Sequence, residues 1–194
     1  MKSRTFIITG SVPLAIALAF TGYNIYEDLR AADDANKIIS QLAFTDSSVN
    51  SAEELPAYIL NPEMEMPVKT IEGNDYIGTL EIPAIGVTLP VICELTDSSL
   101  KIAPSRYAGS VYTDDLIIGA HNYRSHFREL RNLPVGSEVI FTDIEGNIFN
   151  FISTETETLA PTEAEVLKDG DWDITLFTCT FGGQYRIVIR CDKV

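Results

Sequence analysis

The feature that most restricts the fold of this chain is a series of short β-rich segments after residue 75. Seven such segments, punctuated by glycine and proline, occupy residues 76–82, 87–92, 110–121, 137–143, 147–156, 173–179 and 185–191. Short strands at this density, with no helical pattern of about 12 residues between them, are typical of all-β folds. We therefore predict a mostly β structure, either an antiparallel sandwich or a closed barrel.

Two local patterns add detail to this prediction. The sequence Ile-Glu-Gly-Asn at residues 144–147 predicts a hairpin turn between two strands, with Gly146 supplying the positive φ. A short helix is predicted over residues 125–132, where Phe127 and Leu130 recur at helical spacing. Both elements are short, so we expect the fold to remain mostly β with this turn and helix included.

Composition excludes several classes of function. The chain has 194 residues, which allows one domain with appendages. Its 28 acidic and 14 basic residues give a net charge of −14, so binding to a nucleic-acid backbone through a basic face is excluded. Three cysteines are too few for a disulfide-rich scaffold, and their odd number leaves at least one thiol unpaired.

The N-terminal segment has the pattern of a membrane anchor. Residues 6–26 carry no charge, and a helix of about 20 apolar residues matches the hydrocarbon core of a bilayer. Because Lys2 and Arg4 precede this run, we expect a single-pass transmembrane helix with a cytoplasmic N-terminus and the rest of the chain outside the cell. A cleaved signal peptide is the alternative, since Ala17-Leu18-Ala19 resembles a cleavage site.

An acidic connector follows the anchor over residues 27–75. Its first part, residues 27–44, has apolar residues at spacings of three to four and predicts a modestly amphipathic helix. From residue 45 the periodicity ends and serine and proline accumulate, which indicates a stalk or a loosely packed arm. We therefore divide the chain into an anchor (1–26), a helical and acidic linker (27–75) and a β-rich body (76–194), and expect the body to fold by itself.

Three side chains able to carry chemistry stand near strand ends. His121 ends the apolar segment LIIGAH, Cys179 ends ITLFTC, and Arg186 lies at the start of the next strand. A thiol must lose its proton to act as a nucleophile, and a nearby histidine or arginine favours the thiolate. The alternative is that Cys179 is only a small buried apolar residue, as free cysteines often are.

These segments also resemble one known enzyme family. TLFTC at residues 175–179, followed by Arg186, resembles the TLxTC signature and downstream arginine of the sortases, the cysteine transpeptidases of Gram-positive cell surfaces. Residues 77–92 resemble the opening strands of the sortase barrel, and LIIGAHNY at residues 116–123 resembles the segment with its active-site histidine. The match continues in order to the C-terminus, and an N-terminal anchor is also a feature of that family.

The resemblance implies a closed sortase-like β-barrel of about eight strands with short helices. It also implies Cys179 as nucleophile, His121 as acid and base, and Arg186 as the cation that holds the oxyanion or the substrate. Thr178, inside the signature, is a candidate substrate contact. No cofactor and no metal are expected.

By the same resemblance, the implied reaction is a transpeptidation. An LPXTG-like sorting signal of a secreted surface protein is cleaved, a thioacyl-enzyme forms, and the acyl group passes to an amine. The acceptor would be a peptidoglycan precursor or a pilin lysine. The alternatives are a cysteine hydrolase and an inactive anchored β-barrel binding module. A papain-like hydrolase is disfavoured because its cysteine precedes its histidine in sequence, the reverse of the order of His121 and Cys179.

The remaining candidate residues have weaker patterns. We expect His126 to be a solvated surface residue and Cys93 a core residue. Cys191 is either buried, a rival nucleophile, or the disulfide partner of Cys93 outside the cell. The acidic run between residues 155 and 165 is expected to be a solvated loop and not a cation site.

Overall fold

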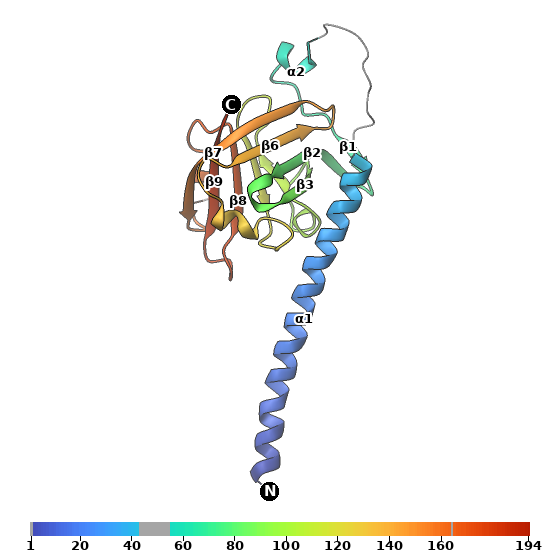
Figure 1. Cartoon of the computed structure of the whole chain (residues 1–194), viewed down its shortest axis with the longest axis vertical. Helices are drawn as coiled ribbons and strands as arrows, with labels where there is room; N and C mark the ends of the chain where they lie inside the picture. Colours follow the sequence, from blue (N-terminus) through green and yellow to red (C-terminus); the bar gives the residue numbers. More distant parts are fainter. Residues whose placement is uncertain (1, 43–54, 164) are drawn as a thin grey trace.

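The structure is a computed structural model that describes residues 2–42, 55–163 and 165–194, with the side chains of the first helix described from residue 12 onward. That helix, α1 (Lys2–Leu42), is continuous. In Figure 1 its C-terminal end lies against a β-barrel and its N-terminal part projects away from the barrel. The helix therefore runs through residue 26, where the sequence placed the boundary between anchor and linker.

Nine strands form one sheet in the described part of the chain. Their bounds are β1 (Lys69–Ile71), β2 (Asn74–Ile82), β3 (Val87–Ile92), β4 (Ser105–Ala108), β5 (Leu116–Ala120), β6 (Glu138–Asp143), β7 (Ile148–Leu159), β8 (Ile174–Cys179) and β9 (Arg186–Lys193). The sheet order is β1-β2-β3-β4-β5-β8-β9-β7-β6, and β6 also pairs with β2, which closes strands β2 to β9 into a barrel. The expectation of a mostly β fold with a closed barrel of about eight strands is confirmed.

Two strand pairs depart from the expected antiparallel pattern. β5 pairs with β8 in parallel, and β3 makes a single parallel bridge to β4. The chain leaves β5 at one edge of the barrel and returns after the β6–β7 hairpin to lay β8 beside it in the same direction. The parallel pair brings the C-terminal ends of β5 and β8 to the same edge of the barrel.

The predicted strands match the structure with three exceptions. β1 and β4 were missed, because β1 has only three residues and Ser-Arg-Tyr-Ala of β4 has no apolar alternation. The segment predicted over residues 110–121 contains strand only from Leu116, since a turn precedes it in which the side chain of Asp115 accepts the N–H of Ser110 at 2.9 Å. Apolar periodicity reports neither such short strands nor the hydrogen bonds of a turn.

The short elements are mostly turns of 3₁₀ helix, with one four-residue α-helix in the linker. Their bounds are α2 (Ala57–Leu60), η1 (Pro83–Ile85), η2 (Ser99–Lys101), η3 (Arg128–Asn132) and η4 (Glu165–Lys168). The helix expected over residues 125–132 is the 3₁₀ turn η3, which is shorter than predicted. The predicted β6–β7 hairpin is confirmed: Gly146 has φ 90°, and the buried carboxylate of Asp143 accepts the backbone N–H groups of Glu145 and Asn147.

The described part of the linker packs on the barrel instead of forming a loose stalk. Ile38 and Leu42 of α1 are buried with Ile71, Tyr76 and Ile92 in a small apolar cluster. β1 adds three residues to β2, and Tyr58 stacks on Tyr112 with ring centroids 4.7 Å apart. Residues 43–54, part of the predicted stalk, lie outside the described residues.

One further observation concerns the membrane anchor predicted from the sequence. Among the helices that the structure describes, none combines the length and the apolar character needed to cross a membrane. The transmembrane helix expected over residues 6–26 is therefore not confirmed.

Candidate active site

The register of β5 and β8 brings together two of the predicted site residues. Ala120 pairs with Thr178 across the parallel strands. His121 directly follows Ala120, and Cys179 directly follows Thr178 as the last residue of β8. Because parallel strands stay in register from one residue to the next, the imidazole and the thiol emerge as neighbours at one edge of the barrel.

Thr178 joins the two strand ends. Its side chain is buried, and its hydroxyl donates a hydrogen bond of 2.9 Å to the carbonyl oxygen of Ala120. The bond lies one residue before both His121 and Cys179, so it fixes the separation of the strands where the two groups emerge. Contact between Thr178 and a substrate stays a prediction.

His121 and Cys179 line one open cavity of about 360 Å³. Phe181, in the turn after β8, lines another part of it and is 89% exposed. Tyr23 and Asp28 of α1 also line it, so the helix contributes a wall. A substrate that enters this cavity can contact the thiol and the imidazole together.

A polar contact holds α1 beside the cavity. The carboxylate of Asp28 accepts hydrogen bonds of 3.1 Å from the backbone N–H and from the hydroxyl of Ser125. Ser125 lies in the loop that follows His121. The helix and the histidine loop are therefore linked directly.

His121 is half-buried, and its surroundings favour the uncharged imidazole. Burial lowers the pKa of His121 below the ordinary value of 6.5, and the positive charge of Lys101 lowers it further, while Asp97 acts in the opposite direction. At neutral pH the ring is mainly neutral. A neutral imidazole beside an exposed thiol can accept its proton.

His126 is not the solvated residue that the sequence predicted. Its side chain is fully buried, and neither ring nitrogen has a hydrogen-bond partner among the described residues. Burial lowers the pKa of His126 to about 4, and the neighbouring His121 contributes to the lowering. The prediction was wrong because the loop after β5 folds back, so that the ring packs against Tyr123 at a centroid distance of 5.4 Å.

Arg186 lies opposite Cys179 in the antiparallel β8–β9 ladder. Directly opposed residues in such a ladder project from the same face of the sheet. The guanidinium of Arg186 is turned to the loop between β7 and β8, where Nη1 donates to the carbonyl oxygen of Pro161 at 2.9 Å. The three predicted residues thus share one edge of the barrel, but the charged end of Arg186 is held by this loop.

Cys191 is excluded as a rival nucleophile by its position. It is fully buried in the main core on β9. Burial raises the pKa of the Cys191 thiol to about 12, so this group stays protonated at neutral pH. All three cysteines are described, and all three are free, so no disulfide joins Cys191 to Cys93.

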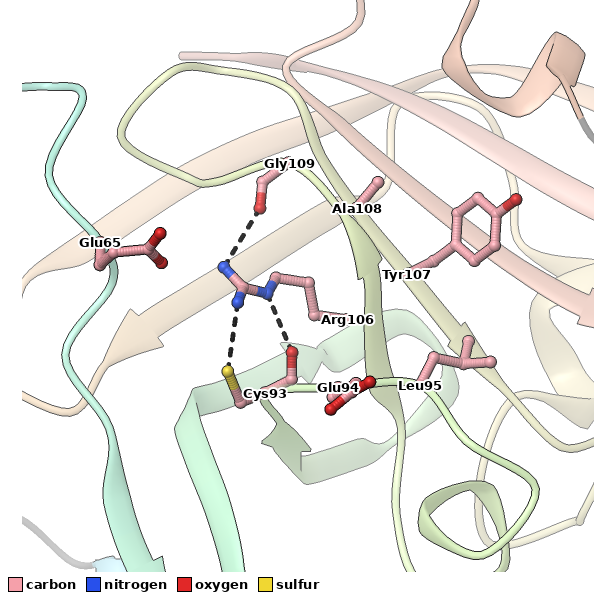
Figure 2. A pocket seen from close by; sticks show the side chains of 8 residues that line it. All are labelled: Glu65, Cys93, Glu94, Leu95, Arg106, Tyr107, Ala108 and Gly109. Atoms are coloured by element: carbon pink, nitrogen blue, oxygen red, sulfur yellow. Dashed lines mark hydrogen bonds between the residues drawn. The ribbon is translucent and has the colours of Figure 1, made fainter.

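Cys93 lies in a different cavity, of about 550 Å³, where β3 and β4 meet (Figure 2). Arg106 donates from Nη2 to the sulfur of Cys93 at 3.1 Å and from Nε to its carbonyl oxygen at 2.9 Å. Figure 2 shows Glu65 beyond the end of the Arg106 side chain, on the segment that precedes β1. No histidine is among the described residues that line this cavity, so Cys93 has no base comparable to His121.

The acidic run is only partly solvated. Glu157 pairs with the buried Arg190 at 3.0 Å, and Glu163 accepts the N–H of Ala160 at 2.6 Å. In the described part of the chain no group of three or more histidine, cysteine, aspartate or glutamate side chains is placed to hold a metal ion.

Sequence reasoning missed two contributors to this region. The first is the α1 wall of the cavity, which no local pattern predicts. The second is Arg190, a fully buried cation under the loop between β7 and β8. A charged residue inside the apolar segment RIVIRC was the one available signal for it, because arginine is rarely buried unless it is paired.

Comparison with known proteins finds similarity to the sortases. A family model described as the sortase domain matches residues 80–194. Sortase A of Bacillus anthracis is 22% identical over 208 residues, covering 100% of this chain and 96% of the relative.

Solved structures show the same fold. A Clostridium perfringens sortase D5 transpeptidase aligns with a TM-score of 0.58 and 20% identity, over 84% of this chain and 96% of that one. Streptococcus pneumoniae sortase C, whose structure was described for its catalysis and pilin substrate specificity, gives a TM-score of 0.58 and 20% identity, over 89% and 88%. Sortase A from Corynebacterium diphtheriae gives 0.56 and 18%, over 96% and 95%.

Proposed function

This chain belongs to the sortase family, and we propose that it is a cysteine transpeptidase that joins a sorting-signal peptide to an amine. The observation that carries the proposal is the placement of His121 and Cys179 at the adjacent ends of parallel strands, on one open cavity. The thiol is exposed, and burial favours the neutral form of the neighbouring imidazole. A thiol and an imidazole of the kinds that can act as nucleophile and base thus line one cavity, which supports the proposal.

In the proposed acylation step, His121 accepts the proton of Cys179 and the sulfur attacks the carbonyl carbon of the scissile amide. Negative charge develops on the carbonyl oxygen, where a fixed cation lowers the barrier. Arg186, opposite Cys179 in the ladder, is the candidate for that role. The C–N bond then breaks, the leaving amine takes the proton from His121, and a thioester remains on Cys179.

In the proposed transfer step, an acceptor amine attacks the thioester. His121 removes a proton from the amine, a new amide forms, and the sulfur leaves and recovers its proton. The energy of the original amide is kept in the thioester and then in the new amide. Exclusion of water from the cavity favours transfer over hydrolysis. The wall contributed by α1 and the turn that carries Phe181 are the elements that can exclude it.

The substrates are proposed by analogy with the family. The donor is an LPXTG-like sorting signal of a secreted surface protein, and the acceptor is an amine of a peptidoglycan precursor or of a pilin lysine. The transpeptidase activity named for the C. perfringens relative and the pilin specificity named for the S. pneumoniae relative support this class of reaction.

We also propose that the N-terminal part of the chain anchors it to the cell membrane, with the barrel outside. Residues 6–26 carry no charge, and Lys2 and Arg4 precede them. The apolar side chains of α1 between Val12 and Ile25 are exposed, and Phe20, for example, is 67% exposed. Membrane fractionation and protease accessibility in intact cells test this: recovery of residues 55–194 in a compartment protected from added protease contradicts it.

A cysteine hydrolase is the second candidate, since water can also attack a thioester. One experiment separates the two functions. The protein is incubated with a library of sorting peptides and several amines, and the products are read by mass spectrometry. We expect a thioacyl adduct on Cys179 and a new amide with at least one amine. A ratio of hydrolysis product to amide product that does not change with any amine indicates a hydrolase. Absence of any thioacyl adduct contradicts both functions.

A further inference from the structure

The outer face of β9 carries two arginines that bind the same loop. Arg186, Val188 and Arg190 alternate along the strand and therefore project from one face. The residues between and after them, Ile187, Ile189 and Cys191, face the main core. The loop of residues 160–173, described except for residue 164, covers the arginine-bearing face.

Arg190 fixes the middle of this loop. It is 1% exposed, and its Nη2 and Nη1 donate to the carbonyl oxygens of Val166 and Leu167 at 2.8 and 3.0 Å. Nη1 also donates to the hydroxyl of Thr175 on β8 at 3.1 Å, and Nε to Glu157 on β7 at 3.0 Å. Four contacts from one rigid guanidinium thus tie two strands to the loop.

Apolar packing fixes the same part of the loop. Leu167 is buried against Phe177 and Val188, with the partly buried Val166 beside them. The Arg190 guanidinium also lies 6.0 Å from the ring of Trp172 near the end of the loop. The loop is therefore held against the sheet at η4 and again near its end.

The start of the loop holds Arg186. Pro161 accepts the hydrogen bond of Arg186 Nη1, and Glu163 closes the turn that contains Pro161 by accepting the N–H of Ala160. Val166 donates its N–H to the carbonyl oxygen of Glu163 at 3.1 Å, which continues this turn into η4. A hydrogen-bonded path thus leads from Arg190 through the loop to the charged end of Arg186.

From this path we propose that Arg190 is a positioning residue for the reaction, acting through the loop of residues 160–173 to set the orientation of Arg186. The inference rests on the proposed function of Arg186 as the cation near the reacting carbonyl. Loss of the Arg190 hydrogen bonds to the loop would free the carbonyl of Pro161 to move. The guanidinium of Arg186, which donates to that carbonyl, would then move with it. Misplacement of a group by about 1 Å can reduce a rate by about 10²-fold.

The test is a double-mutant cycle on thioacyl formation at Cys179, measured by rapid-quench mass spectrometry with a sorting peptide that the wild type accepts. Arg190→Lys keeps the charge, but one ammonium cannot reach Glu157 and both loop carbonyls together. We expect it to lower kcat by about 10- to 100-fold with little change in KM. Arg186→Lys is expected to lower kcat by about 100-fold. The double variant should be no slower than Arg186→Lys.

A matched control separates positioning from general loss of stability. Tyr112→Phe removes a buried 2.8 Å hydrogen bond to Asp143, away from the loop. We expect it to lower the midpoint of urea unfolding while leaving kcat unchanged. Where Arg190→Lys does not fold, Glu157→Gln replaces it in the cycle, because it removes the charge partner of Arg190 and keeps the side-chain volume.

A second measurement does not depend on activity. In ¹⁵N-arginine NMR spectra of Arg190→Lys, the side-chain N–H resonance of Arg186 should shift. The side-chain N–H protons of Arg186 should also exchange faster with water than in the wild type. Additive losses in the cycle, or an Arg186 resonance that stays unchanged, overturn the inference while the proposed function stands. Absence of thioacyl formation in the wild type overturns the proposed function, and the NMR comparison then decides whether Arg190 places Arg186.

Discussion

The hydroxyl of Thr178 donates a 2.9 Å hydrogen bond to the carbonyl oxygen of Ala120, across the parallel strands that end in Cys179 and His121. No pattern within either strand specifies this bond, because the two residues become neighbours only when β8 is laid beside β5. It joins the strands at the last position before the thiol and the imidazole emerge.

Removal of this bond should both destabilise the fold and slow the acylation of Cys179. Thr178→Val keeps the shape of the side chain and leaves the Ala120 carbonyl without its donor, which costs about 1–3 kcal/mol. We expect a lower free energy of unfolding in urea and a lower rate of Cys179 acylation. Thr156→Val, at an exposed position of β7, is the matched control and should change neither. An unchanged acylation rate in Thr178→Val contradicts a role for this bond in aligning the site.

Comparison of two cysteine variants identifies the nucleophile. Cys179→Ala should abolish the thioacyl adduct and all turnover, because no neighbouring group replaces the thiol. Cys191→Ala should remain active, with a small loss of stability from a cavity in the core. Both are read by mass spectrometry and circular dichroism. A folded Cys179→Ala protein that still joins peptide to amine refutes the assignment.

The pH dependence of acylation should report on His121. Because burial lowers the pKa of His121, the rate should fall only when the pH drops below 6.5, as the imidazole becomes protonated. Lys101→Met removes a positive charge that contributes to this lowering, so the acidic limb should move to higher pH. His121→Ala should lose about 10²- to 10⁴-fold in rate. An acidic limb that does not move in Lys101→Met argues against His121 as the titrating group.

Burial of His126 makes the fold sensitive to acid. The pKa of His126 is about 4 in the folded chain and ordinarily 6.5, so the unfolded chain binds the additional proton between these values. Stability should therefore decrease as the pH falls from 6.5 to 4, by about 3 kcal/mol from this group. His126→Leu removes the proton-binding group, and urea unfolding at several pH values should show a smaller decrease. Equal decreases in both proteins would mean that His126 does not contribute.

Truncation tests the contribution of residues 27–75. The sequence suggested that residues 76–194 fold alone, but Ile38, Leu42 and Ile71 cover Tyr76 and Ile92. Each buried aliphatic side chain contributes about 1.5–3 kcal/mol. A fragment of residues 27–194 should therefore unfold at a clearly higher urea concentration than one of residues 76–194. Equal midpoints would show that residues 27–75 add nothing to barrel stability.

Much of the barrel could be predicted from the sequence. Short apolar segments bounded by glycine and proline located seven of the nine strands that the structure describes, because these strands bury apolar side chains in the barrel. Gly146 marked the β6–β7 hairpin for a local reason, its positive φ of 90°. Cys179 and His121 end apolar strands and Arg186 begins one, which singled them out as candidates, while their roles followed from the resemblance to the sortases.

Tertiary structure decided what depends on contact between distant segments. The parallel β5–β8 pairing, the α1 wall beside His121 and the hydrogen bonds of Arg190 to the loop of residues 160–173 all join residues far apart in the chain. Local periodicity reports which face of an element is buried but not which element covers it. For that reason the sequence identified a thiol, an imidazole and a guanidinium, and only the folded barrel determined that the first two share a cavity while a loop holds the third.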